Sequence, residues 1–230
     1  MHKFNFPILS IINSKLIVFT DGFGDFVEKL PMYLKYLIVS FLVICFLLPG
    51  IKSIPPLDRD EARFSQASKQ MLEDQNYVVI KFQDELRAKK PIGIYWVQSL
   101  SAYIFGKESI TSYRIPNVIA FITLTLVFSA FVYNIAYRYF DVAFSTAINY
   151  SLLTSILLSI IFGFAIEIKQ AKTDSILLML CTIQQLIFWK IYNYGKESWN
   201  IYKHNDHAWL VRLFWFILAL GILIKGPISP

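Results

Sequence analysis

Long apolar runs, separated by short polar stretches, dominate the chain and predict membrane-spanning helices. A helix that crosses a bilayer needs about 20 mainly apolar residues. The predicted spans are 33–50, 113–137, 141–163, 173–194 and 209–225. The pattern therefore predicts an all-α, polytopic transmembrane protein with about five spans.

Basic residues near the ends of these runs predict how the chain is oriented. Lys29 and Lys35 lie at the start of the first run and place the N-terminus in the cytoplasm. Residues 1–30 then form a cytoplasmic or interfacial segment. The loops expected inside are 137–141 and 193–207, and those expected outside are 51–112, a stretch near 165–173, and the C-terminal residues. The long outer loop is expected to be helical.

Composition supports a chain that is embedded in lipid. Hydrophobic residues make up 56% and charged residues 17% of the chain, and the mean hydropathy is +0.50. These values exclude a disordered chain, a collagen and a disulfide scaffold, and they argue against a soluble enzyme. The net charge of +6 comes mainly from residues that flank apolar runs. Membrane lipids are therefore expected partners, and nucleic acid is not.

The start of the outer loop carries the first candidate site. Asp58 and Glu61 have the spacing of a capping box, which predicts a helix that begins at about Arg59. Asp60 and Arg63 then lie side by side on the first turn, on the same face as Phe64, Ala67 and Met71. Either this is an amphipathic helix with a local ion pair, or the two charged groups belong to a functional site.

Two further motifs lie where the chain meets the predicted membrane surface. In KKPIGIYW at 89–96, Lys89 and Lys90 stand directly before a proline, where lysines can reach lipid head groups. The stretch 91–106 is apolar but short, and it is typical of a helix that lies at the surface or is half embedded.

The third motif, IEIKQAKTDSILL at 166–178, contains Glu167, Lys169, Lys172 and Asp174 between two apolar runs. These charges mark either a solvated helix end or an acid, Asp174, that points into an outer cavity.

Four segments, in this order and at these places relative to the spans, resemble the GT-C class of polytopic membrane glycosyltransferases. They are RDEARF at 59–64, KKPIGIYW at 89–96, AKTDSILL at 171–178 and LGILIKGPISP at 220–230. The nearest resemblance is to the bacterial lipid A aminoarabinose transferase and protein O-mannosyltransferase-like family. It covers about 31–230 and implies the N-terminal part of such a transmembrane domain, with an outer catalytic loop at about 51–112.

The resemblance implies transfer of a monosaccharide from a polyprenyl-phosphate-linked donor to a lipid A, glycan or protein acceptor. The reaction would take place at the outer face of the bacterial inner membrane. Asp60 falls on the family's catalytic acid, and Arg63 and Lys90 fall on residues that contact the donor phosphate. The other substrate-binding positions it implies are Glu61, Lys89 and Asp174.

Two departures from the family keep other readings open. Related transferases often carry Glu, which helps to hold a metal, where this chain has Lys89, so a divalent cation is not assigned. His204 and His207 lack matching acids or cysteines, and no metal site is assigned to them.

Members of the family continue through further spans into a soluble domain. The chain is therefore expected to transfer little alone and to need a separately encoded C-terminal half. The alternatives are a non-catalytic subunit or remnant and a fragment of an unrelated transporter.

Overall fold

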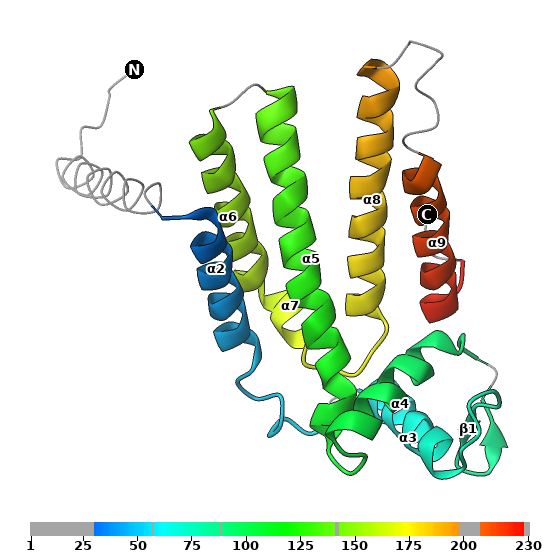
Figure 1. Cartoon of the computed structure of the whole chain (residues 1–230). Coiled ribbons are helices and arrows are strands. Elements are labelled where there is room, and N and C mark those ends of the chain that lie inside the picture. The colour runs from blue at the N-terminus through cyan, green and yellow to red at the C-terminus, as the bar shows by residue number, and fades with distance from the viewer. Residues whose placement is uncertain (1–29, 57, 88, 141–142, 198–207, 228–230) are drawn as a thin grey trace, which may run out of the picture.

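In the described residues, a bundle of apolar helices carries three shorter helices and a small hairpin at one end (Figure 1). The computed structural model describes residues 30–56, 58–87, 89–140, 143–197 and 208–227. The bundle helices are α2 (Met32–Leu47), α5 (Ile110–Tyr139), α6 (Phe144–Ile160), α8 (Asp174–Glu197) and α9 (Ala208–Lys225). The end of the bundle carries α3 (Arg59–Glu73), β1 (Lys81–Phe82), β2 (Glu85–Leu86), α4 (Gly93–Phe105) and α7 (Phe162–Glu167). His204, His207 and nearly all of the predicted segment 1–30 lie outside the described residues.

The five bundle helices confirm an all-α, polytopic membrane protein. Among the described residues, three helices are long and apolar enough to cross a membrane: Ile110–Arg138, Asp174–Asn193 and Ala208–Lys225. Apolar stretches of α2 and α6 are shorter. The predicted span 141–163 ends early as a helix, because Ile161 takes an extended backbone (φ −62°, ψ 111°) and α7 starts after it.

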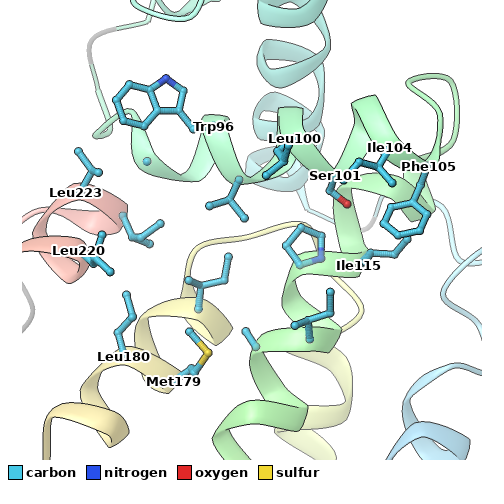
Figure 2. Close-up of a pocket in the computed structure, with 17 residues that line it drawn as sticks. Trp96, Leu100, Ser101, Ile104, Phe105, Ile115, Met179, Leu180, Leu220 and Leu223 are labelled. Carbon is cyan, nitrogen blue, oxygen red and sulfur yellow. The ribbon is translucent and has the colours of Figure 1, made fainter. Parts of the chain in front are cut away.

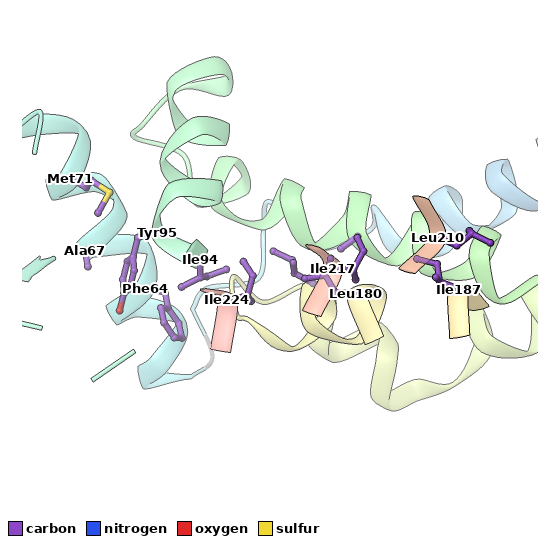
Figure 3. Packing of buried hydrophobic residues seen from close by; sticks show 12 residues of the cluster. Phe64, Ala67, Met71, Ile94, Tyr95, Leu180, Ile187, Leu210, Ile217 and Ile224 are labelled. Carbon is purple, nitrogen blue, oxygen red and sulfur yellow. The ribbon is translucent and has the colours of Figure 1, made fainter. Parts of the chain in front are cut away.

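One apolar core joins the end helices to the bundle (Figure 3). Phe64 of α3 and Tyr95 of α4 pack with their ring centroids 5.6 Å apart. The same cluster continues along the seam between α8 and α9 through Leu180 and Ile217. The apolar part of the predicted α3 face, formed by Phe64, Ala67 and Met71, is thus buried, and this burial fixes α3 against the bundle.

A proline near the start of α5 creates one of the contacts between α4 and α5. Pro116 has no N–H to donate to the carbonyl of Ser112, four residues earlier. The hydroxyl of Ser101 in α4 donates to that carbonyl instead, at 2.5 Å. The carbonyl of Ser112, which Pro116 cannot serve within α5, therefore links α4 and α5 through this hydrogen bond.

The α4 helix has the reverse of the usual arrangement of a water-soluble helix. Its polar side chains Gln98, Ser99 and Ser101 are buried and hydrogen-bonded. Its exposed side chains are apolar or aromatic: Trp96, Leu100, Tyr103, Ile104 and Phe105. A helix with its apolar face outward is typical of apolar surroundings, which agrees with the predicted location at the membrane surface.

Candidate functional site

The first turn of α3 presents the half-exposed acid of the candidate site. Asp58 caps the helix and accepts a hydrogen bond from the backbone N–H of Asp60 at 2.9 Å, which confirms the predicted start at Arg59. The carboxylate of Asp60 lies 3.7 Å from the guanidinium of Arg63, and their side chains are 49% and 33% exposed. Both groups are accessible to a ligand.

Glu61, the next residue, lies on the buried side of α3, inside the protein. Its carboxylate is fully buried and accepts from Nε of Arg114 at 2.7 Å and from the backbone N–H of Ala171 at 3.0 Å. Arg114 is also fully buried, and its Nη1 donates to the carbonyls of Ile51 and Ile54 at 2.7 Å each. This pair links α3, α5 and two loops directly behind Asp60. Glu61 therefore does not close the capping box that its spacing suggested.

Polar side chains also hold the loop that precedes α8. The amide of Gln98 donates to the carbonyl of Ala171 at 3.0 Å and accepts from the hydroxyl of Ser68 at 2.9 Å. Asn117 of α5 donates to the carbonyl of Gln170. These buried contacts fix the backbone of the loop that carries Lys172 and leads to Asp174.

Lys172 on this loop lies against the N-terminus of α3. Its ammonium is 2.6 Å from the carboxylate of Asp58 and 3.9 Å from that of Glu167. The bond to Lys172, helped by the N–H of Asp60, lowers the pKa of Asp58. Burial by itself would lower the pKa of Lys172, but the bond to Asp58 and the neighbouring carboxylates outweigh it and raise that pKa.

The C-terminal end of α9 meets the start of α4. Lys225 forms an ion pair with Asp174, the first residue of α8. Gly93 is in such close contact with α9 that a Cβ on it would lie 2.6 Å from the carbonyl oxygen of Leu223. Gly226, the residue after Lys225, has a φ of +89°, a conformation that favours glycine. The lysine-glycine-proline motif therefore lies beside the segment that contains the two predicted lysines.

Lys89 and Lys90 lie on the connection between β2 and α4, the first exposed and the second half-buried. Among the described residues, neither has a carboxylate within 4 Å. Within the described part of the chain, both ammonium groups are therefore outside the ion pairs that occupy the acids of the site.

Arg87 is a cation of this region that the sequence analysis did not single out. Its Nε donates to the hydroxyl of Tyr95 at 2.8 Å, and its guanidinium lies 5.5 Å from the ring centroid of Phe64. Burial raises the pKa of Tyr95, the bond from Arg87 works against this, and the charge of Asp60 adds to the increase. Arg87 and Tyr95 thus lie close to the exposed acid of α3.

An almost entirely apolar cavity of about 520 Å³ opens between α4, α5, α8 and α9 (Figure 2). Trp96 and Leu100 form its α4 side, and Leu180 and Leu223 come from α8 and α9. Ile176 and Ile224 also line it. In the chain they are two residues and one residue away from Asp174 and Lys225, which form an ion pair.

The acids of this region are paired with cations. Asp58, Asp60 and Asp174 are each next to a lysine or arginine. In the part of the chain that the structure describes, no three His, Cys, Asp or Glu side chains gather as metal ligands would.

Comparison with known proteins shows that the chain is similar in sequence to bacterial arabinosyl transferases. The chain is 34% identical over 73 residues to the undecaprenyl phosphate-alpha-4-amino-4-deoxy-L-arabinose arabinosyl transferase of Yersinia pestis. It is 26% identical over 105 residues to the transferase of the same name from Shewanella sediminis. The matches cover 32% and 45% of this chain but only 13% and 18% of those proteins. No protein-family model matches the sequence.

The fold is similar to crystal structures of ArnT from Cupriavidus metallidurans. The structure bound to undecaprenyl phosphate matches with a TM-score of 0.63 at 16% identity, over 84% of this chain and 32% of that chain. The structure without ligand matches with a TM-score of 0.61. The chain thus spans about a third of those proteins, and its sequence and fold confirm the predicted resemblance to GT-C class glycosyltransferases.

Proposed function

We propose that this chain forms the donor-binding part of a membrane glycosyltransferase that uses a polyprenyl-phosphate-linked sugar. The observation that carries the proposal is an apolar cavity whose lining includes residues close in the chain to the charged pair Asp174 and Lys225. A polyprenyl phosphate has this same division, with a long apolar chain and an anionic head. The isoprenoid chain would lie along Leu100 and Leu180, and the phosphate would lie toward Lys90 and Arg63.

Asp60 is the proposed general base. Its carboxylate accepts the proton of an acceptor hydroxyl while the hydroxyl oxygen bonds to the anomeric carbon of the sugar. The bond between that carbon and the phosphate oxygen breaks, and the electron pair leaves with the polyprenyl phosphate. Attack from the opposite face inverts the anomeric carbon. Arg63 offers a planar fork and Lys90 a point charge to the leaving phosphate.

Glu61 is proposed to position the base rather than to bind substrate. Its buried bonds to Arg114 and Ala171 hold the first turn of α3, so the adjacent Asp60 stays at the surface of the site. Asp174, paired with Lys225, marks the charged end of the cavity. Lys89 is exposed beside Lys90 and adds positive charge there.

The relatives support the class of donor. Their name describes an arabinosyl transferase that uses undecaprenyl phosphate-linked 4-amino-4-deoxy-L-arabinose. We propose lipid A as the acceptor, at the outer face of the bacterial inner membrane. This chain covers a small part of those proteins, so the acceptor side is proposed to involve the remainder of a complete transferase.

Binding of undecaprenyl phosphate to the purified chain in lipid nanodiscs tests the donor site. Leu100→Trp places an indole at the edge of the cavity and is expected to weaken binding by about tenfold or more. Leu178→Trp is the matched control, because Leu178 is an exposed residue of α8 outside the cavity lining. Absence of binding by the unchanged chain, or equal weakening by both variants, would contradict the proposal.

Sugar transfer in native membranes tests the base. With the variant replacing the natural chain, Asp60→Asn is expected to cut turnover by a factor of about 100 or more. Binding of undecaprenyl phosphate should persist, because the asparagine keeps the shape of the side chain. Asp84→Asn, at an exposed turn, is the control carboxylate. Near-full transfer by Asp60→Asn would remove Asp60 from the mechanism.

A further inference from the structure

Arg87 is held rigidly although it lies on a small hairpin. Its Nε bonds to the buried hydroxyl of Tyr95, and its guanidinium lies 5.5 Å and 5.9 Å from the ring centroids of Phe64 and Phe82. Its backbone N–H donates to the carbonyl of Ile80 at 2.9 Å. A guanidinium fixed in this way loses little conformational freedom when it binds a ligand.

The hairpin itself is fastened to α3 by a pair of amide bonds. Gln70 donates to the carbonyl of Gln83 at 3.1 Å and accepts from its backbone N–H at 2.8 Å. The antiparallel pairing of Phe82 with Glu85 closes the turn. The hairpin therefore keeps Arg87 at a set position relative to the first turns of α3.

Arg87 differs from most cations of the end region in its partners. Lys69, Lys81 and Lys107 each lie within 4 Å of a carboxylate. Among the described residues, Arg87 has no carboxylate within that distance, and its hydrogen bond to Tyr95 uses only Nε. The Nη donors of the fork are therefore available to an acceptor from outside the protein.

We propose that Arg87 is a further binding residue for the phosphate of the donor, with its Nη groups donating to two phosphate oxygens. This inference rests on the proposed function and adds a residue to the same site. Tyr95, through its hydroxyl, orients the fork.

The surrounding charges support an anion at this position. Lys89 and Lys90 come two and three residues after Arg87 in the chain, and they also lack a carboxylate within 4 Å in the described residues. Phe64, whose ring centroid lies 5.5 Å from the guanidinium of Arg87, is one helical turn after Asp60 on α3. A phosphate held here would thus have cations on one side and the proposed base nearby, as a leaving group needs.

Paired binding measurements separate phosphate recognition from a structural role. Undecaprenyl phosphate and undecaprenol, which lacks the phosphate, are titrated against the full chain in nanodiscs. Arg87→Gln is expected to weaken binding of the phosphate by about tenfold or more and to leave undecaprenol binding unchanged. Arg87→Lys keeps the charge but loses the fork, so it is expected to restore only part of the affinity.

Two further variants complete the test. Tyr95→Phe removes the acceptor of Nε and is expected to give a smaller loss, again only for the phosphate. Lys81→Gln removes a cation of the same hairpin that is paired with Asp74, and it should bind both lipids as the natural chain does.

Each outcome bears on a different claim. If Arg87→Gln binds undecaprenyl phosphate normally, or loses both lipids equally, the assignment of Arg87 is overturned while the donor site stands. If the unchanged chain binds neither lipid, the proposed function fails, and the assignment fails with it.

Discussion

The buried pair between Glu61 and Arg114 gives the sharpest prediction about stability. Arg114→Met removes a guanidinium with no exposed surface and leaves a buried carboxylate without its cation. It also leaves the carbonyls of Ile51 and Ile54 without the donor that serves both. Loss of one partner of a buried ion pair costs about 3–5 kcal/mol. For a chain of this size that corresponds to a drop of about 6–20 °C in Tm.

Thermal unfolding in detergent, followed by tryptophan fluorescence, measures this change. Lys69→Gln is the matched control: Lys69 is on α3 like Glu61, and its partner Glu108 is 72% exposed, so this pair is worth about 1 kcal/mol or less. The double change Glu61→Leu with Arg114→Met should cost less than the two single changes together, since no buried charge is left unpaired. A Tm for Arg114→Met equal to that of Lys69→Gln, or strictly additive costs, would refute the reasoning.

Three other outcomes are expected. Gly93→Ala adds a methyl group 2.6 Å from a backbone oxygen of α9, and it should lower the Tm and the affinity for undecaprenyl phosphate, whereas Gly163→Ala, with open space around it, should not. The ion pair between Asp58 and Lys172 should stabilise the fold at neutral pH, where Asp58 is ionised. This stabilisation should be lost as pH falls below 3.8 and through the lowered pKa of Asp58, because the carboxylate is then protonated. The difference in Tm between the natural chain and Asp58→Asn should therefore vanish at that low pH. A cysteine at Asp84 should react with an impermeant reagent from outside intact cells and one at Arg138 should not; the opposite result would reverse the predicted orientation.

The sequence was sufficient for the spans and for the first turn of α3. Apolar runs of spanning length become helices because lipid leaves the backbone no other partner for its hydrogen bonds. The capping acid fixed the start of α3, and helical spacing put Asp60 next to Arg63. These features depend on residues a few positions apart, which is where sequence patterns carry structural information.

The partners of the charged residues could not be predicted in this way. Glu61 and Arg114 are 53 residues apart, and Asp174 and Lys225 are 51 apart. One signal was present: an arginine at the start of an apolar run usually has a buried partner, and Arg114 fits this description. Arg87 carried no such signal, because only the packing of the hairpin brings it to Tyr95.

The position of Glu61 sets an order for the assembly of the protein in the membrane. Its carboxylate bonds to a side chain 53 residues later and to a backbone N–H 110 residues later. The loop that contains α3 therefore cannot reach its final packing until synthesis and insertion have passed residue 171. Until then, the carboxylate of Glu61, which is buried in the final structure, is exposed to water.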